Sequence, residues 1–105
     1  MAAYLIVHRR DITNSDALKT YGQGIVQTLS GFGGKVLVRS DAFDVLEGVW
    51  LPGGSAVDTK PDGVVVVEIP DMASLKDWYT SDDYAELKAL RQRSSSFDFV
   101  GVQGL

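Results

Sequence analysis

Two short segments, far apart in the chain, are apolar at almost every position and rich in β-branched residues. Residues 3–9 read AYLIVHR and residues 64–69 read VVVVEI. A half-exposed strand alternates apolar and polar residues, so a segment that is apolar on both faces is typical of the centre of a sheet. The two segments therefore predict the central strands of one sheet that has apolar side chains on both of its faces.

A helix is expected between the first central strand and the next strand. Residues 13–16 offer N-cap side chains, and an apolar stripe at helical spacing follows them. The stripe consists of Leu18, Tyr21, Ile25, Leu29 and Phe32. Gly33 and Gly34 are expected to end this helix through a left-handed cap. Gly22 and Gly24 lie inside it at a cost of about 1 kcal/mol each, and they indicate either a close approach of another group or simple tolerance.

The remaining elements complete a β-α-β-(β)-β-α-α-β order. Strands are expected at residues 35–39, 45–49 and 97–103, and two helical pieces at residues 71–79 and 81–92. Residues 51–63 are dense in turn formers and predict a long loop. This order predicts an α+β fold, a ferredoxin-like sandwich in which helices cover one face of an antiparallel sheet.

Such a sandwich leaves the second apolar face of the central strands without a cover. An uncovered apolar face on a small protein indicates an interface, and a twofold homodimer is the commonest solution. Packing two such faces together is expected to bury on the order of 2,000 Å² in total.

Composition narrows the classes of function. The 105 residues form one domain, 1–105, and the net charge of −4 argues against a nucleic-acid-binding surface. The chain has no cysteine and a single histidine, His8, so neither thiol chemistry nor a metal site is expected. The sequence pattern predicts neither a membrane span nor a secretory signal, and the expected location is the cytoplasm.

Several motifs together resemble a known protein family. They are FGGKVLVR at residues 32–39, VLEGVW at 45–50, VVVVEIPD at 64–71 and DWYTSDDYAELKALRQR at 77–93. The chain resembles the family called domain of unknown function 1330 from Tyr4 to Gly104. The resemblance implies a dimeric α/β barrel, which two ferredoxin-like protomers form, and related families include cofactor-independent monooxygenases and isomerases. The chain departs from the family pattern at Ser40-Asp41, where the family has Gly-Gly, and in the extra residues 53–63.

Arg39 and Glu47 lie on the two arms of an expected hairpin. A four-residue loop would pair Arg39 with Asp44 and send Glu47 to the opposite face. A five-residue loop would place Arg39 and Glu47 diagonally on one face, within reach of each other. Both registers remain open from the sequence, and the resemblance implies a functional role for both residues.

Two further charged residues lie in apolar surroundings. Glu68 belongs to the strand at 64–69, where it is either a general base with a raised pKa or a strand-end residue that reaches solvent. Arg91 shares a helical stripe with Tyr84 and Leu87. It either extends its guanidinium to water or binds an anion, such as a carboxylate of the chain or of a ligand.

These residues define a hypothetical pocket and two classes of function. The ligand-binding candidates are Tyr21, Arg39, Glu47, Trp50, Glu68, Trp78, Tyr84 and Arg91. One hypothesis is a homodimeric small-molecule-binding module for a small anion, without cofactor. The alternative is a cofactor-independent enzyme that acts on a small organic acid or aromatic compound. The scarcity of histidine and the absence of cysteine favour the binding module.

Overall fold

A computed structural model describes residues 1–10, 13–44, 46–47 and 63–105. Its four strands form one antiparallel sheet in the order β2-β3-β1-β4. The strands are β1 (Ala3–Arg9), β2 (Lys35–Ser40), β3 (Gly63–Ile69) and β4 (Asp98–Gln103). The two segments that are apolar on both faces are the central strands, as the sequence predicts, and the order is that of a ferredoxin-like fold.

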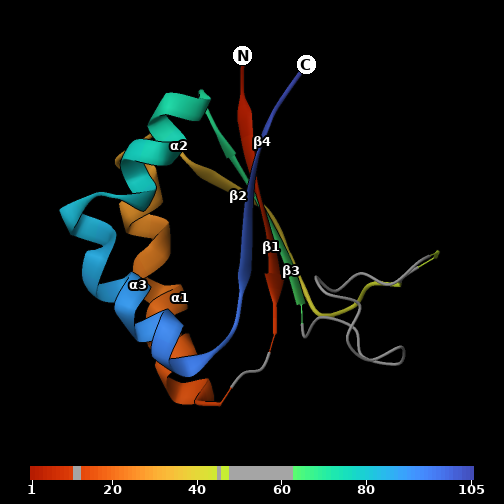
Figure 1. The fold of residues 1–105 in the computed structure, drawn as a ribbon, viewed down its shortest axis with the longest axis vertical. Helices are drawn as coiled ribbons and strands as arrows, with labels where there is room; N and C mark the ends of the chain where they lie inside the picture. The colour runs from red at the N-terminus through yellow and green to blue at the C-terminus, as the bar shows by residue number, and fades with distance from the viewer. Residues whose placement is uncertain (11–12, 45, 48–62) are drawn as a thin grey trace.

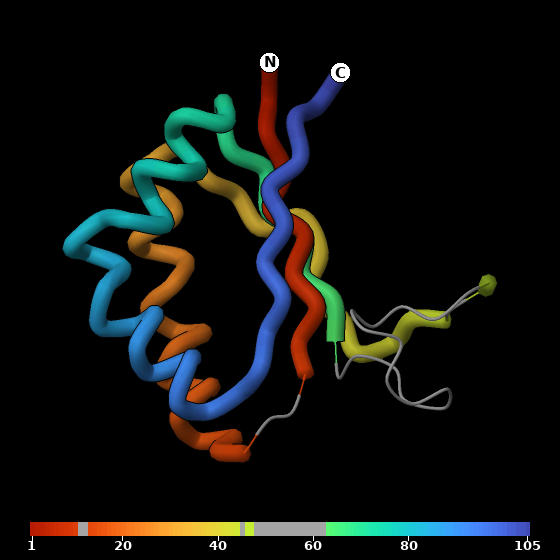
Figure 2. Tube along the Cα trace, viewed as in Figure 1, coloured from red at the N-terminus to blue at the C-terminus, as the bar shows by residue number. Residues whose placement is uncertain are grey.

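Three helices form a second layer, α1 (Ser15–Ser30), α2 (Met72–Tyr79) and α3 (Asp82–Ser94). Figure 1 shows all three on one side of the sheet, and the trace in Figure 2 shows the same two layers. The predicted α+β sandwich is therefore confirmed. Each helix in the described ranges is too short or too polar to cross a membrane.

Local capping explains where the helices begin and end. Side-chain oxygens of Asn14, Asp71 and Ser81 accept hydrogen bonds from backbone N–H groups in the first turns of α1, α2 and α3. Beyond α1 the left-handed residue is Gly33, with φ of 78°, and the N–H of Gly34 donates to the carbonyl of Leu29 at 2.8 Å. The two glycines that the sequence singles out thus turn the chain toward β2.

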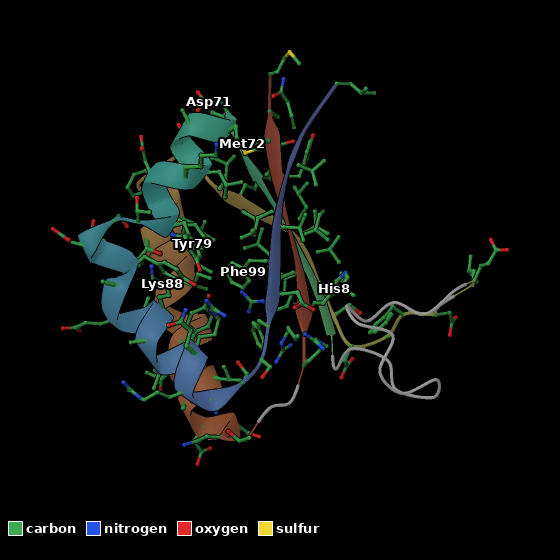
Figure 3. The ribbon with its side chains drawn as sticks, in the orientation of Figure 1. His8, Asp71, Met72, Tyr79, Lys88 and Phe99 are labelled. Atoms are coloured by element: carbon green, nitrogen blue, oxygen red, sulfur yellow. The ribbon has the colours of Figure 1, made fainter. Side chains whose placement is uncertain are left out.

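The two faces of the sheet follow from strand alternation. Leu5 and Val7 of β1 are buried under the helices, whereas Ile6 and His8 lie on the opposite face. We call this opposite side the open face. Figure 3 shows Phe99 on the helix side of β4 and His8 on the open face. Large apolar side chains are exposed there, and they include Val38, Val100 and Val102 at 43%, 50% and 44%.

The expected hairpin of residues 35–39 with 45–49 is not observed in the described residues. Residues 45, 48 and 49 lie outside them, while Leu46 is 94% exposed and Leu46 and Glu47 belong to no strand. β2 pairs with β3, where Arg39 lies opposite Val65. Glu47 is exposed to solvent, and no ion pair joins it to Arg39.

Candidate functional site

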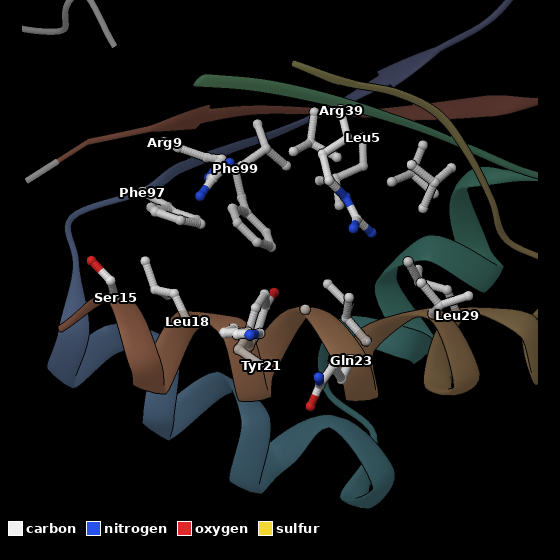
Figure 4. Close-up of a pocket in the computed structure, with 18 residues that line it drawn as sticks. Leu5, Arg9, Ser15, Leu18, Tyr21, Gln23, Leu29, Arg39, Phe97 and Phe99 are labelled. Atoms are coloured by element: carbon white, nitrogen blue, oxygen red, sulfur yellow. The ribbon is translucent and has the colours of Figure 1, made fainter. Parts of the chain in front are cut away.

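A cavity of about 610 Å³ lies between α1 and the helix side of the sheet. Figure 4 shows α1 as one wall and the strands as the other. Most of its lining is apolar and includes Leu5, Val7, Leu18, Ile25, Val36 and Val67. A volume in this range fits a small organic molecule.

The two glycines of α1 contribute to this arrangement in different ways. Gly22 lines the cavity, and a Cβ atom added there would meet no atom within 4 Å. A Cβ added at Gly24 would lie 3.0 Å from a side-chain carbon of Leu87 on α3. Gly24 therefore permits close helix packing, whereas at Gly22 a small side chain would fit and the missing side chain leaves room at the cavity.

The charged residues at the cavity are all cationic. Arg9, Lys19 and Arg39 line it, and its described lining includes no aspartate or glutamate. Figure 4 shows Arg9 and Arg39 on the sheet side, opposite the helix residues. Neither arginine has a carboxylate within 4 Å among the described residues. The cavity thus combines apolar walls with unpaired positive charge, which suits an organic anion.

Among the polar residues that α1 contributes to the lining, Tyr21 is buried, whereas Ser15, Lys19 and Gln23 are exposed. Its hydroxyl oxygen is 2.7 Å from that of Tyr84, and Nε of Arg91 donates to the Tyr84 hydroxyl at 3.3 Å. Burial raises the pKa values of Tyr21 and Tyr84 above the ordinary value of a phenol. The positive charge of Arg91 lowers the pKa of Tyr84, but it offsets the effect of burial only in part. Both hydroxyls therefore stay protonated at neutral pH.

Arg91 is buried, with 4% of its surface exposed. Its guanidinium carbon lies 4.2 Å from the centre of the Phe99 ring, a cation–π distance. The interpretation in which this arginine extends into water is therefore wrong, because Tyr84 and Phe99 hold it inside. The described residues supply no carboxylate within 4 Å of it. It lines a second cavity of about 520 Å³ beside β4.

The predicted site residues do not all meet at the larger cavity. Tyr21 and Arg39 line it. Trp78 and Tyr84 are fully buried behind it, with their ring centres 4.1 Å apart. Trp50 lies outside the described residues.

Two acidic candidates point elsewhere. Glu47 is exposed and absent from the cavity lining. Glu68 lies on the open face opposite Tyr4, whose hydroxyl donates to it at 3.2 Å. Glu68 is thus separated from the cavity by the sheet itself. The described residues also hold no cluster of three acidic or histidine side chains suited to a metal ion.

Sequence reasoning missed Arg9, Phe97 and Phe99 as cavity residues. Alternation contains the signal for Arg9, because it follows Leu5 and Val7 at a spacing of two and so shares their face. Phe97 and Phe99 share a face in the same way. Which part of the apolar stripe on α1 faces Arg9, Phe97 and Phe99 depends on how the helices pack on the sheet. The sequence does not show that packing.

Comparison with solved structures shows the fold. A protein of unknown function from Rhodopseudomonas palustris matches with a TM-score of 0.74 and 18% identity, over 99% of this chain and 82% of that one. SnoaB, a cofactor-independent oxygenase from Streptomyces nogalater, matches with a TM-score of 0.64 and 5% identity, over 99% and 93%. A dimeric ferredoxin-like protein of unknown function from Thermobifida fusca matches with a TM-score of 0.60 and 12% identity, over 99% and 92%.

Comparison with sequences identifies the family. The search among curated proteins gave no match. The model of the family described as Domain of unknown function (DUF1330) matches residues 2–105, which is nearly the whole chain. The motifs at residues 32–39, 64–71 and 77–93 lie within this match. The chain therefore belongs to the DUF1330 family.

Proposed function

We propose that this protein is a homodimeric binding module for an amphipathic organic anion, and that the anion occupies the cavity between α1 and the sheet. The observation that supports this most is the pairing of apolar walls with Arg9 and Arg39, which have no carboxylate partner among the described residues. A carboxylate of the ligand would take the place of that partner, and the hydrocarbon part of the ligand would pack against the apolar walls.

The expected energies suit a small-molecule site. Transfer of about 200 Å² of apolar ligand surface from water contributes roughly 5 kcal/mol. A charge-assisted hydrogen bond from an arginine adds about 1.5–3 kcal/mol. After the loss of ligand freedom on binding, these terms correspond to affinities in the micromolar to millimolar range.

The side chains at the cavity favour binding over catalysis. An acid–base enzyme needs a group whose pKa lies near the working pH. The raised pKa of Tyr21 keeps its phenol protonated, and the described lining has neither histidine nor carboxylate. Tyr21 is therefore suited to donate a hydrogen bond. The alternative, a cofactor-independent enzyme, would need a base from another part of the chain or chemistry that the ligand itself supplies.

The open face supports the homodimer part of the proposal. Ile6 and Val66 lie at its centre as register partners, with Val38 and Val100 on the flanking strands. Val38 and Val100 are exposed and Ile6 and Val66 between them are half-buried, so the four strands present an apolar surface that a second copy of the same sheet would cover. The likeness to a protein described as dimeric agrees with this proposal.

Isothermal titration calorimetry tests the binding proposal. The panel contains aromatic and branched aliphatic monocarboxylates, each with its primary amide as a neutral control of the same shape. We expect acids to bind and their amides to bind at least about tenfold more weakly, because the arginines select the charge. Equal affinity of acid and amide, or no binding by any acid, would overturn the proposal. Chromatography of the acid after prolonged incubation with the protein in air distinguishes a binding module from a cofactor-independent enzyme. A binding module leaves the acid chemically unchanged.

A further inference from the structure

Three buried side chains form a hydrogen-bonded chain that runs from α3 to the larger cavity. The Nε–H of Arg91 donates to the hydroxyl oxygen of Tyr84, which in turn contacts the hydroxyl of Tyr21 at 2.7 Å. All three residues are at most 6% exposed. Of these three residues, Tyr21 alone lines the cavity, so Tyr21 is the member of the hydrogen-bonded series that a ligand would contact.

The order of the protons in this chain follows from the number of donors. A phenol has one proton to donate, and its oxygen can accept. The oxygen of Tyr84 already accepts the Arg91 N–H, and within the described ranges its one other partner is Tyr21. If Tyr21 donated to Tyr84, the proton of a fully buried phenol would remain without an acceptor, which is unfavourable. Tyr84 therefore donates to Tyr21.

This order leaves the proton of Tyr21 directed at the cavity. Beside Tyr84, its hydroxyl oxygen has the Arg91 guanidinium as a partner, which donates to it, so the proton of Tyr21 still has no acceptor among the residues that the structure describes. Figure 4 shows the Tyr21 side chain rising from α1 toward the sheet side, where Phe99 lies. The charge of Arg91 polarises this series of hydrogen bonds, because each hydrogen bond makes the next hydroxyl group a stronger donor.

We propose that Tyr21 is a donor subsite for a neutral oxygen of the ligand, such as a ketone carbonyl, and that Tyr84 and Arg91 orient its proton. The inference rests on the proposed function, in which Arg9 and Arg39 bind the anionic group. It narrows the ligand class from amphipathic anions to oxo acids whose second oxygen lies within the apolar part. Tyr84 and Arg91 act through Tyr21 and are positioning residues.

A pair of acids of equal shape tests the subsite. Calorimetry compares 4-acetylbenzoate with 4-isopropylbenzoate, which lacks the carbonyl oxygen, on the parent protein and on Tyr21→Phe. The ratio of the two affinities is expected to shift against the acetyl compound by about three- to tenfold in Tyr21→Phe. Tyr79→Phe, which changes a tyrosine outside this cavity, is the control and keeps the parent ratio. An unchanged ratio in Tyr21→Phe would overturn the subsite.

A second measurement needs no ligand and so separates this inference from the proposed function. In equal parts H₂O and D₂O, a slowly exchanging tyrosine hydroxyl splits its ¹³Cζ resonance into two lines. Tyr84, whose proton is enclosed between two side chains, is expected to give two lines, and Tyr21 one averaged line. The reverse pattern would overturn the proton order. If neither acid binds, the proposed function and the oxo-acid assignment fail together, and the proton order is judged by the spectrum alone.

Discussion

The two faces of the sheet use the same strands for different purposes. On the helix side, Arg9 and Arg39 are charged side chains without a carboxylate partner in the described part of the chain, and they border a hollow. On the open face, Tyr4 donates to Glu68 and Arg10 pairs with Asp98 at 2.8 Å, so two of its carboxylates have partners within the chain. Its centre is apolar, and none of the described helices lies over it.

This difference separates the proposed ligand site from the proposed protein interface. An unpaired cation beside an apolar hollow is stabilised by an anion that enters from solution. A face whose centre is apolar is stabilised when a second sheet excludes water from it. The first two predictions each change one face and use a matched change elsewhere as the control.

The largest effect is expected from a charge placed on the open face. Val100→Asp would put a carboxylate beside Ile6 in both copies of the proposed dimer, and the cost of burying it should raise the dimer dissociation constant at least about 100-fold. The control is Val26→Asp on α1, because Val26 is 47% exposed and Val100 is 50% exposed. Analytical ultracentrifugation measures both. Dissociation by the control, or a dimer that tolerates Val100→Asp, would contradict the assignment of the faces.

The second largest effect is expected from removing the charge of Arg39 at the cavity. Arg39→Met keeps most of the apolar stem and removes the charge, so the affinity for an organic acid should fall about 10- to 100-fold. Lys35→Met changes a cation on the same strand that lies opposite Glu68 on the open face, and it should leave the affinity nearly unchanged. Calorimetry measures the affinity of both variants for the acid. Equal losses of affinity in Arg39→Met and Lys35→Met would mean that β2 contributes only general positive charge.

A smaller effect is expected from the two glycines of α1. Gly22→Ala should raise the free energy of unfolding by about 1 kcal/mol, since the added methyl group meets no atom and alanine favours the helix. Gly24→Ala gains the same propensity but presses on Leu87 at 3.0 Å, which offsets the gain. Urea unfolding compares the two variants. Equal stabilisation would show that α1 and α3 pack less closely than described.

The smallest effect is a dependence of stability on pH. Burial lowers the pKa of His8 below 6.5, although Asp98 raises it and Arg10 lowers it further. A folded pKa below the unfolded one means that the neutral imidazole is favoured in the folded state, so stability is retained above pH 6.5 and falls as pH falls through the folded pKa. The parent should therefore lose more stability than His8→Gln between pH 7 and pH 5. Identical unfolding curves for the pair at both pH values would refute this role of His8.

Most of the fold could be predicted from the sequence because the strong signals are local. The apolar strands at residues 3–9 and 64–69, the caps at Asp71 and Ser81, and Gly33 after the first helix each act within a few residues. The expected hairpin depended on a register that two loop lengths could satisfy, and most of its second arm lies outside the described residues. The strand partner of β2 is β3, which lies more than twenty residues further along the chain.

The candidate site was harder to predict because it depends on which faces meet. Tyr21 and Arg39 could be found from their positions on an apolar stripe and a strand. Glu68 belongs to the other face, since its neighbour Val67 occupies the helix side of β3. The hydrogen bond between Tyr21 and Tyr84 joins two helices and has no sequence signature.

We infer that the cavity under α1, and not the open face, receives the ligand. A ¹³C-methyl spectrum of the protein titrated with 4-isopropylbenzoate tests it most directly, because both faces carry valine and isoleucine methyl groups. We expect the shifts to concentrate at Val7, Ile25 and Val36, which line the cavity, while Ile6, Val66 and Val100 stay unchanged. Shifts confined to the open face, or no shift at any cavity methyl group at saturating acid, would contradict it.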